Sequence, residues 1–329
     1  MAGFVMVPLD GSALSEQALP LAVSLAQRIK RGLLLVQVVP RPSLSYIPGS
    51  EVTPLELVQA FRESSESYLR QVKEQLEGTE VPISISIIEG DAGQAIADLA
   101  NNQQPSYIVM STHGRSGLSR WALGSVADRV LHLTTRPLIL MRPRESESDD
   151  LRATPLLKAH LLDDLPEVKR IVVPLDDSLL AKQVLPHVKK LARLYNAEIV
   201  LFHALTAPPP TLVGAWNSKN HWDQTMHDEV EAHLKRIVLG LQMDGYRARF
   251  TIGLTPVAEA ILAYAAGIDA DMIAMTTHAR AGLSRLILGS VTDKVVQGGG
   301  LPILITKLHT TLEPLKKGLS SQSEALSRK

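Results

Sequence analysis

Short apolar runs alternate with amphipathic stretches along most of the chain. Early in the chain, runs at 4–9, 33–39, 107–112 and 137–141 have the length of buried strands, whereas 82–88 alternates isoleucine with serine. All-apolar runs suit strands that are covered on both faces, and the alternating segment suits an edge strand. The pattern therefore predicts a β-α-β-α-β-α-β-α-β unit, with parallel strands joined by right-handed crossovers.

Apolar positions spaced three and four apart predict a helix after each of the first four strands. The first of these helices follows Ser12, whose hydroxyl can accept a hydrogen bond from an amide of the first turn. The others are expected at about 54–77, 91–103 and 119–133. A proline-rich loop separates the second strand from the long helix at 54–77.

The segment 111–130, STHGRSGLSRWALGSVADRV, returns at 276–295 as TTHARAGLSRLILGSVTDKV, with most positions identical. The first strand returns as well, because IVVPLDDS at 171–178 matches VMVPLDGS at 5–12. A long helix at about 218–242 again follows a proline-rich loop. The chain is therefore a duplication.

We predict an α/β protein with two tandem open parallel five-stranded sheets and helices on both faces of each. The domains are expected at 1–143 and 169–307, and a charged, serine-rich linker is expected at 144–168. Residues 308–329 are polar and lysine-rich, as expected for a tail.

Composition excludes several classes of function. The 34 basic and 34 acidic residues balance, and only 4% of residues are aromatic, which argues against nucleic-acid binding. Without cysteine, there is no disulfide, thiolate catalysis or cysteine-bound zinc. The sequence shows no signal peptide and no apolar run of membrane-spanning length, so we expect a cytoplasmic protein that does not contact a membrane.

Candidate chemistry lies where the first and fourth strands end. In an open parallel sheet, ligands bind beyond the carboxyl ends of the strands. The first strand ends at Pro8-Leu9-Asp10, and the fourth leads into the repeated loop. If the next helix begins near Gly124 instead of Ser119, its amides and the Ser125 hydroxyl would face a phosphate.

The loop also has simpler explanations. Gly114 and Gly117 could only make the turn, Arg115 could be a solvated surface residue instead of a phosphate ligand, and Asp10 could only cap the next turn. The arginine and the Gly-Ser pair are both present in each copy, which favours a binding role.

These residues resemble the universal stress protein family in its tandem form. The family motif is Gly-x2-Gly-x9-Gly-(Ser/Thr), through which ATP-binding members hold the triphosphate. Its positions in the first half are Ser111, Gly114, Gly124 and Ser125. In the second half they are Thr276, Ala279, Gly289 and Ser290, so two of three glycines are replaced there.

The resemblance implies strand order 3-2-1-4-5, with ATP, and Mg²⁺ bridging its phosphates, between the first and fourth strands. It implies recognition of adenine by backbone at Val38 and Ala204, and pairing of the two domains through their fifth strands; whole chains could pair again. The residues expected at the two nucleotide sites are Pro8, Leu9, Asp10, Val38, Ser111, Thr112, His113, Gly114, Arg115, Ser116, Gly117, Gly124, Ser125, Val126, Pro174, Asp176, Ala204, Thr276, Ala279, Arg280, Gly282, Gly289, Ser290 and Val291.

The function implied is an ATP-binding protein of stress response or signalling. We expect the first half to bind ATP better, because Ala279 adds a Cβ where backbone would run against phosphate. No carboxylate pair or lysine in the motif resembles a phosphoryl-transfer site, so at most slow hydrolysis is expected. The alternatives are an interaction protein without nucleotide and a true ATP hydrolase or nucleotidyl transferase.

Histidines elsewhere suggest no catalytic or metal site. His221, His227 and His233 are six residues apart, which places them on different sides of a helix, whereas helical ligands are three or four residues apart. His113 and His278 follow a strand, but the sequence places no acid or nucleophile beside them. We therefore expect no metal site and no catalytic residue.

Overall fold

The computed structural model describes most of both halves of the chain. The described residues are 3–41, 53–113, 123–143, 165–176, 181–205, 219–277 and 289–307. The expected tail, most of the expected linker and the middle of both repeated loops lie outside these ranges. The domain boundaries stay predictions.

Both halves follow the predicted alternation of strands and helices. The first half comprises β1 (Val5–Pro8), α1 (Ala13–Glu16), α2 (Leu19–Ile29), β2 (Leu33–Val39), α3 (Pro54–Gln75), β3 (Ile83–Glu89), α4 (Ala92–Gln103), β4 (Tyr107–Ser111), α5 (Ser125–Leu133) and β5 (Leu138–Met141). The second comprises β6 (Arg170–Pro174), the short 3-10 helix η2 (Ala181–Val184), α6 (Leu185–Tyr195), β7 (Glu198–Leu205), α8 (Lys219–Met243), β8 (Ala248–Leu254), α9 (Val257–Gly267), β9 (Met272–Thr277), α10 (Ser290–Gly298) and β10 (Ile303–Lys307).

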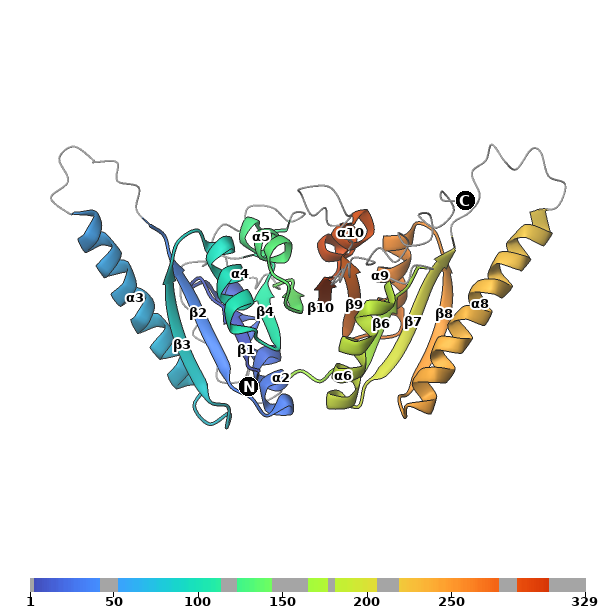
Figure 1. The fold of residues 1–329 in the computed structure, drawn as a ribbon, viewed down its shortest axis with the longest axis horizontal. Coiled ribbons are helices and arrows are strands. Elements are labelled where there is room, and N and C mark those ends of the chain that lie inside the picture. The colour runs from blue at the N-terminus through green and yellow to red at the C-terminus, as the bar shows by residue number, and fades with distance from the viewer. Residues whose placement is uncertain are drawn as a thin grey trace, which may run out of the picture.

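The strands form one sheet in the order β3-β2-β1-β4-β5-β10-β9-β6-β7-β8 (Figure 1). Each half therefore has the order 3-2-1-4-5, with its strands parallel, which confirms the predicted fold class. The alternating segments form β3 and β8 at the two edges. The expected split into two sheets is not found, because β5 and β10 pair antiparallel, with Leu140 opposite Ile303. Apolar edges at both fifth strands favour this continuity.

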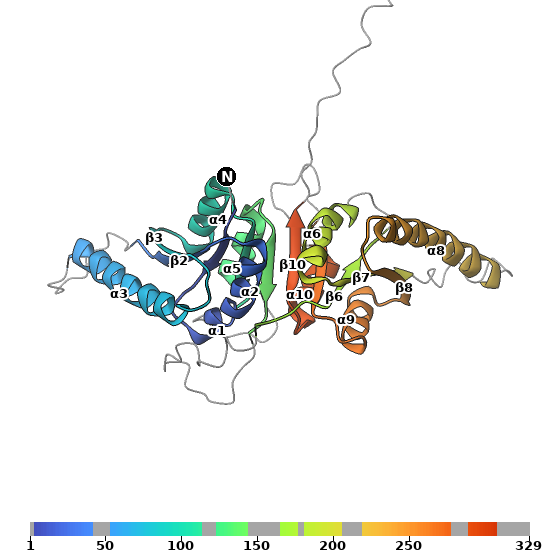
Figure 2. The ribbon, with the colours of Figure 1, turned by 90° about the horizontal axis from the view of Figure 1, so that it is seen from below.

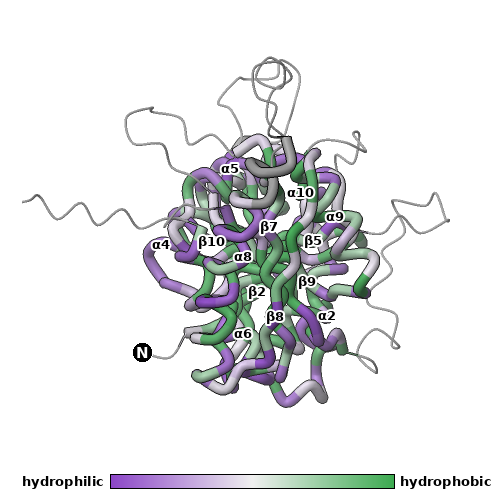
Figure 3. Tube along the Cα trace, turned by 90° about the vertical axis from the view of Figure 1, so that its right-hand side faces the viewer, coloured by the Kyte–Doolittle hydropathy of each residue, from purple (hydrophilic) through white to green (hydrophobic). Residues whose placement is uncertain are grey.

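Helices cover both faces of the sheet and bury one hydrophobic cluster on each (Figures 1 and 2). Side chains of α2, α3, α6 and α8 build one cluster, and side chains of α4, α5, α9 and α10 build the other. Both clusters include residues of both halves. The strands carry the most hydrophobic positions, at the centre of the molecule (Figure 3). This two-sided burial explains the all-apolar runs seen in the sequence.

Reciprocal contacts join the halves beside the β5–β10 ladder. Arg142, just after β5, donates to the carbonyl of Gln297 near the end of α10. Lys307, at the end of β10, donates to the carbonyl of His132 near the end of α5. Each half thus supplies a cation to the carboxyl end of a helix in the other, where backbone carbonyls lack helical partners. Burial lowers the pKa of Lys307 to about 8.

Two predicted helices begin differently from the expectation. The single helix expected after Ser12 is divided into α1 and α2, because Pro20 lies in the first turn of α2 and cannot continue α1. Ser12 caps α1 as predicted, and its hydroxyl accepts from Ser15 N at 3.2 Å. The helix expected from Ser119 instead begins at Ser125. No helix in the described part of the chain is both long and apolar enough to span a bilayer.

Candidate functional site

A cavity of about 300 Å³ lies where β1 and β4 end in the first half. Ten of the residues expected at a nucleotide site line it: Pro8, Leu9, Asp10, Val38, Ser111, Thr112, His113, Gly124, Ser125 and Val126. They come from β1, β2, β4 and the start of α5. The duplication and the sheet topology therefore bring stretches that are far apart in the sequence to one place.

The turn after β4 is held by its own polar groups. The Ser111 hydroxyl donates to the carbonyl of His113 at 2.7 Å. Gly124 N donates to the carbonyl of Thr112 at 2.9 Å, which brings the start of α5 against the end of β4. A Cβ on residue 124 would lie 2.5 Å from that same oxygen. Since the backbone of Gly124 is extended, with φ −60°, glycine is needed here for close approach rather than for its φ.

Helix α5 presents its amino end to the cavity. Its first described helical bond runs from Asp128 N to Gly124 O at 2.9 Å. The amides of Ser125, Val126 and Ala127 precede that bond, and all three residues line the cavity. Amides of a first turn have no partner within their helix and carry partial positive charge, which suits an anion. Of the two helix starts that the sequence left open, the structure has the later one, which presents these amides to the cavity.

Strand β2 offers a free backbone edge at the other end of the cavity. The carbonyl of Val36 accepts from Leu9 N, on the β1 side, at 2.8 Å, and Val39 O accepts from Gly90 N, on the β3 side, at 3.0 Å. Backbone groups alternate between the two neighbours of a strand. The N–H and C=O of Val38 therefore point to the β1 side, where β1 has already ended at Pro8. This pair, one donor and one acceptor, matches the hydrogen-bonding edge of a purine.

A rigid turn holds Asp10 at the cavity wall. One Asp10 carboxylate oxygen accepts from the Ser12 amide at 3.0 Å and from the Ser12 hydroxyl at 2.6 Å. The Ser15 hydroxyl donates to the carbonyl of Ser12 at 2.8 Å and accepts from Asp10 N at 3.3 Å. Asp10 does cap the turn, as the simpler reading supposed. It also lines the cavity, so the two readings are compatible.

Both halves of the chain match one family of known proteins. The model of the universal stress protein family matches residues 1–142 and again 167–307. The chain belongs to the universal stress protein family. The two matches also show the tandem arrangement that the repeated loop predicts, and they agree with the two halves of the sheet.

Individual relatives of this universal stress protein cover one half or the whole chain. A universal stress protein of Methanocaldococcus jannaschii is 28% identical over 143 residues, which are 44% of this chain and 84% of the relative. One from Mycobacterium tuberculosis is 31% identical over 147 residues, 42% of this chain and 45% of the relative. The crystal structure of a universal stress protein from Archaeoglobus fulgidus matches with TM-score 0.67 and 20% identity, over 93% of this chain and 99% of that one. At that identity the likeness shows the fold alone.

The sequence missed some residues at the first-half site of this universal stress protein and named others outside the described part. The missed lining residues are Ser15, Gln37, Ala92, Ile96, Met110 and Ala127. Gln37 and Met110 have a usable signal, because each directly precedes a predicted residue, Val38 or Ser111. Ser15 reaches the cavity through the turn after β1, and the residues of α4 and α5 become neighbours only through helix packing. Gly114, Arg115, Ser116 and Gly117 lie outside the described residues, as do Ala279, Arg280 and Gly282 in the second half.

The second half of the universal stress protein repeats the frame of the site. Pro174 ends β6 and Asp176 follows it, Thr276 lies near the end of β9, and Ser290 and Val291 open α10. On β7, Phe202 O accepts from Leu175 N at 2.8 Å and Leu205 O from Thr255 N at 3.3 Å, so the Ala204 backbone points beyond the end of β6. However, among the described residues a Cβ on Gly289 would meet only the Thr292 hydroxyl, at 4.0 Å. The close approach that requires Gly124 therefore has no counterpart in the described part of the second half.

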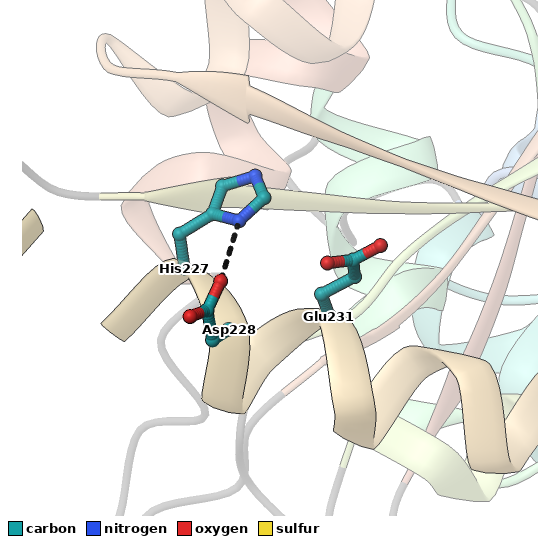
Figure 4. Close-up of side chains that lie close together, drawn as sticks. All are labelled: His227, Asp228 and Glu231. Carbon is teal, nitrogen blue, oxygen red and sulfur yellow. Dashed lines mark ion pairs between the residues drawn. The ribbon is translucent and has the colours of Figure 1, made fainter. Parts of the chain in front are cut away.

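One cluster of potential metal ligands lies far from the cavity, on α8 (Figure 4). His227, Asp228 and Glu231 offer ligand atoms that all lie within 4.8 Å of one another. His227 was weighed with His221 and His233 because histidines are the obvious ligands, whereas Glu231, one helical turn after His227, completes the cluster. His227 and Asp228 are exposed, and Glu231 forms an ion pair of 2.7 Å with Lys235. Solvated charges on the outer face of a helix explain this cluster without a metal.

Proposed function

We propose that this protein binds ATP in the first-half cavity and acts in stress response as a nucleotide-binding module. One observation carries the proposal: a single cavity joins a free donor–acceptor edge on β2 to the amides that open α5. An adenine can pair with the first and a polyphosphate with the second. Membership of the universal stress protein family supports the role in stress response.

The residues present fit such a ligand at both ends. Val38 supplies an N–H and a C=O, which suits the N1 and N6 positions of adenine. The apolar side chains of Ile96, Met110 and Val126 line the space between, where a planar base and a sugar can displace water. Ser125, at the start of α5, would hold the phosphate end of the ligand, and Mg²⁺ bound with the nucleotide would neutralise phosphate charge there. The described lining of the cavity holds one carboxylate, that of Asp10, and no lysine, so we propose that ATP is held and hydrolysed slowly or not at all.

The two halves are proposed to differ in affinity, with the first half as the working site. Support comes from the closed Gly124–Thr112 turn, which fixes the start of α5, and from the lack of an equivalent close approach to Gly289 by any described residue. A preorganised anion site loses less entropy on binding than one that must be ordered by its ligand. The cytoplasmic location and the pairing of whole chains stay predictions.

Two measurements on the full chain test this proposal. Mass spectrometry of material released by denaturing freshly purified protein should identify an adenine nucleotide. Titration calorimetry of nucleotide-free protein with ATP and Mg²⁺ should give one tight site per chain. No bound nucleotide and no heat would refute the proposal and favour an interaction protein, whereas two equal sites would refute the difference between the halves. Turnover above roughly one per second would indicate a true enzyme.

A further inference from the structure

A buried carboxylate lies behind the cavity wall and has no role in the site described so far. Glu16, the last residue of α1, is 3% exposed. The Tyr68 hydroxyl, from α3, donates to its Oε1 at 2.9 Å. Its Oε2 is buried and has no hydrogen-bond partner among the described residues. A buried carboxyl group with one unsatisfied oxygen is costly, so such a group calls for an explanation.

Glu16 is tied to Asp10 by the turn that holds Asp10 at the cavity. The Ser12 hydroxyl bonds both the Asp10 carboxylate, at 2.6 Å, and the amide of Ser15, at 3.2 Å. Ser15 immediately precedes Glu16 in α1. A change in the position or charge of Glu16 is therefore transmitted through one short helical turn to the cavity wall.

The surroundings of Glu16 disfavour its charge. Burial raises the pKa of Glu16, and the nearby negative charge of Asp10 raises it further, while the hydrogen bond from Tyr68 lowers it. Tyr68 and Asp10 are the titratable groups of the described residues that face Glu16, the first from α3 and the second from the end of β1. The pKa of Tyr68 is itself raised by burial, so Tyr68 stays a neutral donor.

We propose that Glu16 is a positioning residue that acts through Asp10, so that an anionic ligand binds in the first-half cavity with uptake of a proton by Glu16. This inference rests on the proposed function, which supplies the anion. A polyphosphate at α5 adds negative charge near two carboxylates, and protonation of Glu16 removes one of them. A protonated Glu16 also turns its unsatisfied oxygen from an acceptor into a potential donor.

The direction of the pH dependence follows from linkage. If the complex binds more protons than the free protein, affinity rises as pH falls through the window between the two pKa values of Glu16. The steepest dependence for one proton is about tenfold in affinity per pH unit. Outside that window Glu16 has the same charge in the free protein and in the complex, so it adds nothing to the pH dependence of the affinity.

The second half provides an internal contrast. The match of VMVPLDGS to IVVPLDDS places Lys182 at the position of Glu16. The buried Leu69 of α3 corresponds to Leu234 of α8, which places His233 at the position of Tyr68. The carboxylate and its tyrosine donor therefore have no counterpart at the matching positions of the second half.

Calorimetric titration of the full chain with ATP, repeated in buffers of different ionisation enthalpy between pH 5.5 and 8.5, measures the proton uptake. The wild type should take up part of a proton that Glu16→Gln does not, and affinity in Glu16→Gln should lose this component of its pH dependence. Titration of the terminal phosphate of ATP is common to both proteins and cancels in the difference. Glu77→Gln, an exposed glutamate beyond the end of α3, is the matched control and should behave as wild type.

A second variant separates this role from a merely structural one. Tyr68→Phe removes the bond that lowers the pKa of Glu16, so the pH window should move to higher pH. A purely structural role would weaken binding equally at every pH in both variants, and that result would overturn the inference. Equal proton uptake in wild type and Glu16→Gln would overturn it as well, while ATP binding itself stands. Absence of any ATP binding at all pH values would instead refute the nucleotide site, and the inference with it.

Discussion

The two halves of the molecule share a fold but differ at the edge where a ligand would bind. In the first half, the start of α5 is pressed against the end of β4, and Gly124 N bonds Thr112 O. In the second, Gly289 keeps the sequence and the extended conformation, but nothing described lies within van der Waals distance of its missing Cβ except at the limit of 4.0 Å. As far as the described residues go, the close contact that requires a glycine at position 124 is therefore not repeated at position 289.

The difference extends to the packing beneath the site. Val36 and Ile88 of the first half correspond to Phe202 and Gly253 of the second, on neighbouring strands in each case. Phe202 fills the place next to Gly253, where a Cβ would lie 2.5 Å from the phenyl ring. It also packs against Tyr264 of α9, with ring centroids 5.4 Å apart. In the second half, a larger side chain on the inner strand thus compensates for the missing side chain on the edge strand, and the sheet is unchanged.

The largest effect is expected from Gly124→Val, compared with Gly289→Val. The valine at 124 cannot coexist with the close approach to Thr112 O, so the start of α5 must move. We expect ATP affinity to fall by roughly 100-fold or more, equivalent to about 2.7 kcal/mol. Gly289→Val should leave ATP affinity within about twofold, by the same scale. Calorimetry gives both affinities, and thermal unfolding verifies that each variant is folded. Equal losses in the two variants would contradict the asymmetry.

Exchanging the packing of the halves tests the volume argument. Phe202→Val should leave a void that costs about 2 kcal/mol, and Gly253→Ile should clash with the ring and cost about 1–3 kcal/mol. The double variant restores the valine–isoleucine pair of the first half. Its loss of unfolding free energy should be smaller than that of either single variant, and therefore smaller than their sum. Urea unfolding of the four proteins measures the coupling. Additive costs would show that Phe202 and Gly253 do not share one space.

A smaller effect is expected at Asn101, which corresponds to Ala266. Its side chain donates to Leu133 O at 3.1 Å and accepts from Thr135 N at 2.9 Å, so it ties α4 to the end of α5. Asn101→Ala should cost about 1 kcal/mol of unfolding free energy. Ala266→Asn should gain nothing, because Gly299 and Gly300 replace the threonines that bond Asn101. A clear gain in Ala266→Asn, measured by urea unfolding, would contradict this reading.

The last comparison concerns the reciprocal cations, through the buried amine of Lys307. The pKa of Lys307 in the folded protein is about 8, below its ordinary 10.5, so the unfolded state binds more protons between these values. Unfolding free energy should therefore rise with pH across about 8 to 10.5, and this component should be absent below pH 8. Lys307→Arg should remove the rise, since an arginine side chain stays charged across this pH range. An unchanged pH profile in Lys307→Arg would exclude Lys307 as its source.

Much of the fold could be predicted because its signals are local. All-apolar runs predicted the central strands of the first half, the alternating segment 82–88 predicted its edge strand, and the repeat predicted the tandem arrangement. The break between α1 and α2 also has a local signal, because Pro20 is typical of the first turn of a new helix. The apolar stripe continues across this break and therefore favoured one uninterrupted helix. Continuity of the sheet depends on two strands far apart in the sequence, and no local pattern reveals it.

The site was harder to predict, for a physical reason. Positions 122, 126 and 130 continue a helical stripe, so local pattern favoured a helix through residue 124. The structure starts α5 later because Gly124 N is taken by a carbonyl of β4, which is a tertiary contact. Glu16 escaped notice for the same reason. A glutamate in the first turn after a strand reads as a solvated residue, and only Tyr68, from the distant α3, shows that it is buried.

The antiparallel pairing of β5 with β10 has a consequence for folding during translation. Strand β5 is entirely apolar, and β10, its antiparallel partner, is the last strand in the chain. During translation the β5 edge is therefore complete only after the whole second half has left the ribosome. An open apolar edge invites pairing with other chains, so nascent or truncated copies are exposed to aggregation until that moment. Because both halves belong to one chain, β10 then reaches β5 at a high effective concentration. A separate subunit would have to find this edge by diffusion.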